Sequence, residues 1–188
     1  MIVRDLHFSF ADSEIFDGLN LDIADGRITA IMAPSGKGKS TLLRLIAGLL
    51  TPTRGSIDTN GRSVGIMFQE PRLFPELTVL QNIMLVMNQK HGKKERAIQL
   101  LSAFDISEAA DKYPEELSGG MAKRVSLARI IAYDAEVLLL DEPFSALDLN
   151  TKAHVMNQTK QLVADKTVIL VTHDKEEADH FADFLIEL

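Results

Sequence analysis

A glycine- and serine-rich loop at residues 33–40, Ala-Pro-Ser-Gly-Lys-Gly-Lys-Ser, constrains this chain more than any other feature. The loop follows a short β-rich run at residues 27–32 and precedes a helical pattern of leucines at residues 40–50. Phosphate oxygens need several backbone N–H donors that converge from a tight turn, which favours glycine, while a lysine adds positive charge and a serine adds a hydroxyl for magnesium. The loop therefore predicts a nucleotide-phosphate site, although Ala33 stands where the pattern GxxxxGK[ST] has its first glycine.

Strand-like and helical patterns alternate after this loop. Nearly continuous apolar runs at residues 63–69, 136–141 and 167–171 are typical of buried strands, and helical patterns at residues 117–132 and 149–163 separate them. The alternation predicts an α/β fold with a mainly parallel sheet, covered by helices on both faces, whose ligands gather at the carboxyl ends of the strands.

Two regions differ from this alternation. Residues 2–32 alternate apolar and polar side chains, as strands with one covered face do. Residues 77–113 are wholly helical in pattern and predict an inserted lobe. We expect a single domain at residues 1–188, with a core at about residues 1–70 and 117–188 and a helical subdomain at about residues 71–116.

Composition and charge exclude several classes of protein. The chain has 20 Lys and Arg residues against 27 Asp and Glu residues, and the resulting net charge of −7 is the wrong sign for a general nucleic-acid binder. The absence of cysteine excludes disulfides and thiolate metal sites. The longest apolar run, at residues 137–140, is far shorter than the roughly 20 residues that span a bilayer, and the start lacks the layout of a signal peptide. We therefore expect a cytoplasmic protein with no nucleic-acid partner.

Two short segments carry further chemistry. Asp141 and Glu142 end a buried strand, where one carboxylate can reach a magnesium ion and the other can orient a water for in-line attack on a γ-phosphate. Residues 117–121, Leu-Ser-Gly-Gly-Met, open a helix with a serine cap and expose N–H groups to an anion. Taken alone, the acidic pair is equally typical of a solvated strand end, and the second segment is more simply a capped helix start.

The ordered set of motifs resembles the nucleotide-binding domain of an ATP-binding cassette (ABC) transporter over nearly the whole chain. A Walker A-like loop at residues 33–41, a signature at residues 117–120 and a Walker B segment at residues 140–142 match in order. The other matching segments are a Q-loop at residues 67–71, a D-loop at residues 145–148 and a switch histidine within residues 171–174. The resemblance implies a P-loop NTPase core, an N-terminal antiparallel β subdomain, an inserted helical subdomain, and hydrolysis of ATP with Mg²⁺.

The resemblance also implies catalytic roles. Glu142 would be the base that polarises the attacking water, and His173 would contact the γ-phosphate, although a lone histidine after a strand is more often structural. Asp141 would hold Mg²⁺, with Ser40 and Gln69 near the ion. Lys39 would hold the β- and γ-phosphates and belongs with Gln69 among the catalytic groups.

Further residues would bind the nucleotide. Phe10 lies where the family has an aromatic residue that stacks on adenine, although Phe8 competes with it and a core strand position is an alternative. Lys37 would strengthen ATP binding or be solvated outside the loop. The phosphate-binding residues that the resemblance implies are Pro34, Ser35, Gly36, Lys37, Gly38, Lys39, Ser40 and Thr41.

In this family the signature closes over the ATP of a second copy. Asp148 would communicate across that interface. Hydrolysis should be cooperative, because neither site is complete until the dimer closes. The helical subdomain would meet an integral membrane permease, with Gln69 as a hinge, unless its apolar faces are only lobe core. The permease would hold the chain at the inner face of the cell membrane, and an extracytoplasmic solute-binding protein would act indirectly. The signature residues that would contact the partner's nucleotide are Ser118, Gly119, Gly120 and Met121.

The chain departs from the family pattern at Ala33 and at Met121, where the family usually has glycine and glutamine. The Ala33 methyl group fits only an ordinary backbone conformation, and we expect a small cost. Met121 lacks the amide hydrogen bonds of glutamine, which affects the contact across the dimer more than the site in cis. The sequence given ends soon after the switch histidine, and we expect it to lack the further strands and the regulatory domain common in the family.

Two functions remain open on the sequence alone. The first is the ATPase subunit of an ABC transporter that energises solute transport, expected to be import, through a separate permease. The sequence of residues 68–75 resembles the corresponding segment in importers of the nitrate, sulfonate and taurine group. The alternative is a non-transport nucleotide switch that dimerises on ATP and regulates a soluble partner.

Overall fold

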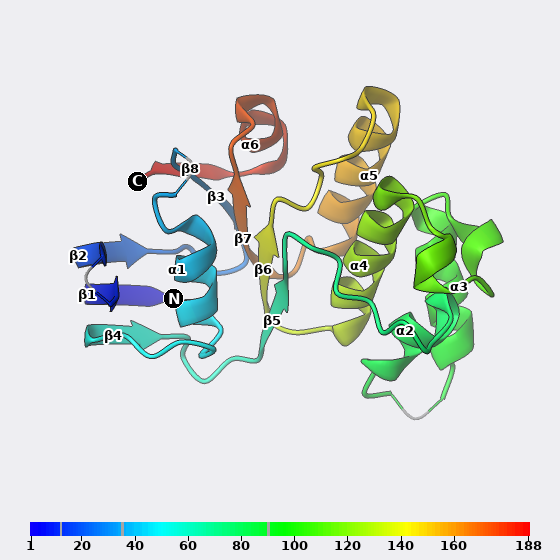
Figure 1. The fold of residues 1–188 in the computed structure, drawn as a ribbon, viewed down its shortest axis with the longest axis horizontal. Coiled ribbons are helices and arrows are strands. Elements are labelled where there is room, and N and C mark those ends of the chain that lie inside the picture. The colour runs from blue at the N-terminus through cyan, green and yellow to red at the C-terminus, as the bar shows by residue number, and fades with distance from the viewer. Residues whose placement is uncertain (12, 35, 90) are drawn as a thin grey trace. The chain divides into compact units, whose positions relative to one another are not determined.

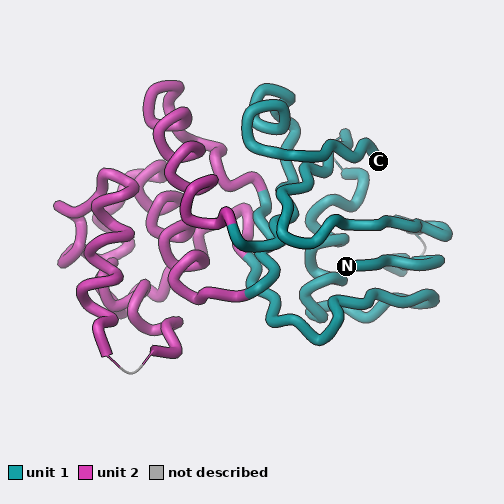
Figure 2. The backbone as a smooth tube through the Cα atoms, turned by 180° about the vertical axis from the view of Figure 1, so that it is seen from behind, with its two compact units in different colours: residues 1–66, 136–141, 165–188 teal, residues 67–135, 142–164 magenta. Residues whose placement is uncertain are grey.

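The computed structural model describes residues 1–11, 13–34, 36–89 and 91–188. These residues form two compact units, which Figure 2 shows in separate colours. Unit 1 contains residues 1–66, 136–141 and 165–188, and unit 2 contains residues 67–135 and 142–164.

Unit 1 is organised around a five-stranded sheet (Figure 1). Strand β3 pairs in parallel with β7 and β8, and β6 pairs in parallel with β7. The predicted α/β fold with a mainly parallel sheet is therefore confirmed. In spatial order the strands are β5 (Val64–Met67), β6 (Val137–Asp141), β7 (Thr167–Thr172), β3 (Ile28–Met32) and β8 (Phe184–Glu187).

The central strands of this sheet are almost wholly buried. Every residue of β6 and β7 is buried, and so are the first four of β3. Helix α1 (Lys39–Ile46) packs against β6, and α6 (Lys175–Phe181) packs against β3 and β7. The register places Met32 beside Thr172 and Asp141 beside Val171. Since the strands are parallel, the segments that follow them leave the sheet at one edge.

An antiparallel sheet in the same unit has the order β2-β1-β4. Strand β1 (Ile2–Phe10) lies between β2 (Ser13–Asp22) and β4 (Arg54–Asp58), and one apolar core joins these strands to α1 and the parallel sheet. The antiparallel subdomain was predicted, but β4 was not. Residues 51–55 are polar and contain proline and glycine, a pattern that is typical of a helix stop and not of a strand.

Unit 2 is mainly helical. Helices α2, α3 and α4 pack against one another. Asn82, which is fully buried, accepts a hydrogen bond from Phe74 N at 2.8 Å and donates to the carbonyl oxygens of Phe74, Leu77 and Thr78. The elements are α2 (Val79–Leu85), α3 (Lys93–Ala103), two 3₁₀ turns η1 (Ser107–Ala109) and η2 (Pro114–Glu116), α4 (Gly119–Tyr133) and α5 (Leu149–Leu162).

Other element boundaries differ modestly from the sequence-based expectation. Helix α1 ends at Ile46, earlier than the expected residue 50, because Gly48 adopts a positive φ of 70°. Strand β8 and helix α6 were not anticipated, so the chain does contain a further strand after the switch histidine. Among the described residues, no helix is both long enough and apolar enough to cross a membrane.

Gly55 provides a test of how β4 pairs with β1. It has a φ of 88°, and a Cβ placed there would clash with the carbonyl oxygen of Asp5 and lie 2.5 Å from that of Arg4. We expect Gly55→Ala to lower the free energy of unfolding by about 2 kcal/mol or more, because strain and a backbone clash add. Urea denaturation measures this change.

Gly61 supplies the matched control. It also has a positive φ, 70°, but a Cβ there meets nothing within 4 Å. Gly61→Ala should therefore cost only the conformational strain, about 1 kcal/mol. Equal losses for the two variants would contradict the proposed clash.

Candidate nucleotide and hydrolysis site

The glycine-rich loop leaves β3 and enters α1. Gly36 and Gly38 have φ angles of 82° and 84°, in the region that glycine tolerates best. A Cβ at Gly38 would clash with Ile15 and lie 2.8 Å from Phe16 Cζ. The loop therefore needs glycine at this position for two reasons, its backbone angle and its contact with β2.

Lys39 places a cation on the loop. Its side chain is largely buried, with 8% of the residue exposed, and Nζ donates to the carbonyl oxygens of Ala33 at 2.6 Å and Pro34 at 3.1 Å. Hydrogen bonds from an ammonium group to an anionic oxygen are stronger than those to a neutral carbonyl. The loop thus holds an ammonium group that can exchange its carbonyl partners for phosphate oxygens.

The remaining loop residues have different surroundings. Ala33 is not among the described residues with positive φ, so its methyl group adds no strain of that kind. Lys37 is exposed, whereas Ser40 and Thr41 are partly buried in the first turn of α1. Ser35 was predicted to bind phosphate but lies outside the described residues.

The loop shares a pocket with the predicted switch histidine within unit 1. His173 follows β7 and is exposed, and Thr172 before it donates from Oγ1 to Glu177 Oε2 at 2.7 Å and accepts from Asp174 N at 3.0 Å. These bonds fix the turn that presents the imidazole. The pocket has a volume of about 450 Å³ and is lined by Met32, Ala33, Pro34, His173, Glu187 and Leu188.

Asp141 and Glu142 have contrasting environments. Asp141 ends β6 with 5% of its surface exposed, whereas Glu142 is half-buried and has a φ of 46°. Positive φ costs a non-glycine residue about 1–3 kcal/mol and is concentrated at functional sites. Ser145 stabilises the turn, because its Oγ donates to the Glu142 carbonyl oxygen at 2.8 Å. Within unit 2, Gln69 Nε2 donates to Glu142 Oε2 at 3.3 Å.

The signature segment begins α4. Ser118 is the N-cap, and its Oγ accepts a hydrogen bond from Met121 N at 3.3 Å, as the predicted serine cap requires. A Cβ at Gly119 would meet nothing within 4 Å, whereas one at Gly120 would lie 3.2 Å from the Ala146 carbonyl oxygen. The signature therefore packs against the D-loop on one side and offers an open backbone at Gly119.

Asp148 ends the D-loop and caps α5. Its Oδ1 accepts a hydrogen bond from Thr151 N at 3.1 Å. Hydrogen bonding to Thr151 lowers the pKa of the Asp148 carboxyl below its ordinary value of 3.8, although the group is exposed. The charge also lies at a helix N-terminus, where an anion is favourable.

The two aromatic candidates for adenine stacking differ in exposure. Phe8 is 8% exposed and belongs to the core, whereas Phe10 is 46% exposed. Their rings meet edge to face, with centroids 4.8 Å apart. Phe8 is therefore a core residue, and Phe10 is the ring whose exposed surface could stack on adenine.

Sequence reasoning missed the residues that hold the Q-loop. Lys123 Nζ donates to the Gln69 carbonyl oxygen at 2.5 Å. Arg129 Nη2 and Nη1 donate to the carbonyl oxygens of Pro71 and Arg72 at 2.8 and 2.9 Å. Both Lys123 and Arg129 lie on α4. A basic residue at an apolar position of a helix indicates a buried cation with a polar partner, and this pattern could have identified them from the sequence.

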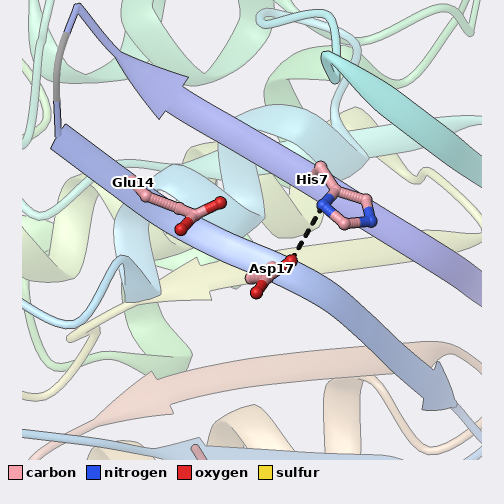
Figure 3. A group of neighbouring side chains, drawn as sticks. All are labelled: His7, Glu14 and Asp17. Carbon is pink, nitrogen blue, oxygen red and sulfur yellow. Dashed lines mark ion pairs between the residues drawn. The ribbon is translucent and has the colours of Figure 1, made fainter.

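A separate group of possible metal ligands lies on the antiparallel sheet. His7, Glu14 and Asp17 bring one ligand atom each to within 4.8 Å of one another (Figure 3). His7 Nδ1 forms an ion pair with Asp17 Oδ1 at 3.1 Å, and Nε2 lies 3.1 Å from Asp5 Oδ1. Both ring nitrogens thus have carboxylate partners.

The strand-loop-helix geometry, the buried aspartate and the lysine on the loop define a P-loop nucleoside triphosphatase. Comparison with known proteins gives the family. Residues 16–145 match the model of the ABC transporter family, and the chain belongs to this family. The resemblance inferred from the motifs is confirmed, and the chain is an ATP-hydrolysing cassette.

Several relatives are similar over nearly the whole chain. The aliphatic sulfonates import ATP-binding protein SsuB 1 of Pseudomonas syringae pv. syringae is 43% identical, over 97% of this chain and 78% of the relative. The sulfate/thiosulfate import ATP-binding protein CysA of Synechocystis is 40% identical, and the chain spans only 57% of its length. The ATP-binding cassette MJ0796, solved as a dimer in a post-hydrolysis state with ADP and Pi, superposes with a TM-score of 0.87 at 30% identity, covering 100% of this chain and 93% of MJ0796.

The lowered pKa of Asp148 gives a prediction for stability against pH. A carboxyl with a lowered pKa in the folded state contributes stability above its ordinary pKa of 3.8, and this contribution is lost as the pH falls through the lowered value. Asp148→Asn keeps a capping oxygen but removes the charge. We expect it to have a lower Tm than the parent chain at about pH 7, and this difference should shrink as the pH falls below 3.8 and vanish below the lowered pKa, as measured by thermal melts at decreasing pH.

Asp148→Ala is the control, because it removes the capping oxygen as well as the charge. Its Tm should stay below that of Asp148→Asn throughout the pH range. A pH-independent difference between the parent chain and Asp148→Asn would show that the charge of Asp148 contributes nothing to folding.

Proposed function

We propose that this chain energises solute import through a separate membrane permease, and that it acts as a dimer with a second copy of itself. The names of the relatives support import, and aliphatic sulfonates and sulfate are the solutes that those names give. The observation that carries the catalytic part is Glu142, which directly follows a fully buried strand, has a positive φ and is bonded to Gln69.

The described residues of unit 1 fit a magnesium nucleotide. Asp141 supplies a buried carboxylate at the end of β6, and Ser40 supplies a hydroxyl in the first turn of α1. Mg²⁺ prefers such oxygen ligands, together with phosphate oxygens and water. When bound, the ion neutralises charge that develops on the phosphate oxygens. Lys39 would add a second positive charge, and Phe10 would stack on the adenine ring.

Hydrolysis needs a water that attacks the γ-phosphorus in line with the leaving oxygen. In our proposal the Glu142 carboxylate accepts a proton from this water, while the Gln69 amide orients the carboxylate. His173 contributes the contact to the γ-phosphate from the pocket that it shares with Ala33 and Pro34.

The second copy would complete each site. Ser118 and the open backbone at Gly119 are available for the γ-phosphate of a partner protomer, and Asp148 lies in the D-loop that Gly120 contacts through Ala146. The dimeric cassettes of known structure support this arrangement. The main-chain N–H of Met121 is already bonded to Ser118 Oγ in the helix cap. In the dimer, the Met121 side chain and not its main-chain N–H would therefore face the partner.

The helical part of unit 2 is the proposed contact for the permease. Tyr133, which is 37% exposed, lines a hollow of this unit, and exposed apolar surface of this kind marks interaction sites. Through the permease the chain would lie at the inner face of the cell membrane, and an extracytoplasmic solute-binding protein would act indirectly. The hollow has a volume of about 210 Å³ and is lined by Met87, Asn88, Gln89, Arg96, Ile131, Ala132, Tyr133 and Asp134.

Glu142→Gln tests the catalytic assignment. It keeps the shape of the side chain but cannot accept the proton, so the ATP turnover number should fall by about 100-fold or more. Glu136→Gln is the matched control at the other end of β6, and its turnover should stay close to that of the parent chain. A Glu142→Gln variant with unchanged turnover would exclude Glu142 as the base.

Co-purification tests the permease. A tagged chain expressed in its native cell should retain a multi-span membrane protein, and Tyr133→Asp should weaken that association because it places a charge on the apolar surface. Leu185→Asp changes an exposed apolar residue of unit 1 and should leave the association intact. Recovery of soluble partners alone would favour the alternative function, a nucleotide switch that regulates a soluble protein.

A further inference from the structure

Lys123 is a buried cation within α4. The residue is 3% exposed, although lysine is rarely buried, since removing an ammonium group from water is costly without a partner. Its Nζ donates to the Gln69 carbonyl oxygen at 2.5 Å. The charge of Lys123 therefore acts on the main chain of the Q-loop and not on an exposed surface.

Gln69 is held at both of its ends. Its main-chain carbonyl accepts from Lys123, and its side-chain amide donates to Glu142 Oε2 at 3.3 Å. All three residues belong to unit 2. A chain of hydrogen bonds thus runs from the ammonium group on α4, through one residue of the Q-loop, to the proposed catalytic carboxylate.

A second cation of α4 holds the next part of the Q-loop. Arg129 donates to the carbonyl oxygens of Pro71 and Arg72, and burial lowers the pKa of Arg129. Helix α4 starts at the Ser118 cap. The helix that begins with the signature therefore holds the main chain at three carbonyl groups, two in the Q-loop and that of Arg72 directly after it.

We propose that Lys123 is a positioning residue for ATP hydrolysis, which holds the Gln69 main chain so that the Gln69 amide meets Glu142. This proposal rests on the proposed role of Glu142 as the base. Lys123 touches neither the nucleotide nor the water in this account, and it acts through Gln69. Positioning matters because a catalytic group displaced by about 1 Å can lose about 100-fold in rate.

The first experiment measures the turnover number and KM for ATP of the full-length Lys123→Met variant. Methionine keeps the length and apolar stem of lysine but cannot donate a hydrogen bond. We expect the turnover number to fall by about tenfold or more and KM to change by less than about twofold, because nucleotide binding does not involve the Gln69 carbonyl. Lys123→Gln, which keeps an N–H donor, should recover part of the loss.

Arg124→Met is the matched control on the same helix. Arg124 also donates to main-chain carbonyl oxygens outside the Q-loop, to those of Phe104 and Asp105 at 2.8 and 2.9 Å and, more weakly, to that of Gly120 at 3.4 Å. Thermal melts compare the stability of the two variants. We expect Arg124→Met to lower the Tm about as much as Lys123→Met does, while its turnover number stays close to that of the parent chain. This result would show that the loss of turnover in Lys123→Met comes from positioning and not from general destabilisation.

A double-mutant cycle with Gln69→Ala gives the decisive readout. If Lys123 acts through the Gln69 amide, Lys123→Met should lower turnover by less than about twofold once that amide is absent. Full turnover in Lys123→Met, or losses that multiply in the double variant, would overturn the proposal. Normal turnover in Glu142→Gln would instead reject the proposed base, so the two failures are distinguishable.

Discussion

The parallel pairing of β3, β7 and β6 is the constraint on which the nucleotide site depends. Each of these strands is almost wholly apolar and buried, so a slip of one residue would exchange the side chains that pack on the two covered faces and disturb the packing on both. The resulting register brings Met32 and Thr172 to the same level and Asp141 beside Val171. The phosphate loop and the switch histidine share a pocket because the residues before them cannot shift.

A different kind of constraint holds the Q-loop in unit 2. The Q-loop has no strand partner after β5, and its carbonyl groups accept hydrogen bonds from Lys123 and Arg129. A long cationic side chain can satisfy main-chain oxygens where no ladder is available, and burial makes the loss of either partner expensive. Hydrogen bonds from cationic side chains of α4 thus hold the Q-loop in place, whereas apolar burial holds the strands of unit 1.

The fold could be predicted where its determinants are local in sequence. The buried strands, the loop before α1 and the serine cap of α4 each depend on residues within a few positions of one another, and all are present. Strand β4 was missed because its pairing with β1 tolerates polar residues and needs Gly55 at positive φ, which resembles a turn.

The candidate site could not be predicted from the sequence where contacts between distant residues determine exposure and hydrogen-bond partners. The exposure that separates Phe10 from Phe8 follows from the packing of a whole sheet. Lys123 bonds a carbonyl oxygen 54 residues away, and a carbonyl group is common to every residue, so no side-chain pattern marks the partner. The roles of the matched motif residues stay predictions, while their neighbours are now defined.

The position of β3 between β7 and β8 has a consequence for how the protein is made. During synthesis the phosphate loop emerges early, but both strands that flank β3 are encoded near the other end of the chain. Such long-range pairing slows folding, and unpaired apolar strands are prone to aggregate until it is complete. A nascent chain therefore contains the nucleotide-binding sequence long before it has a nucleotide-binding site, and chaperone dependence during translation should be concentrated in that interval.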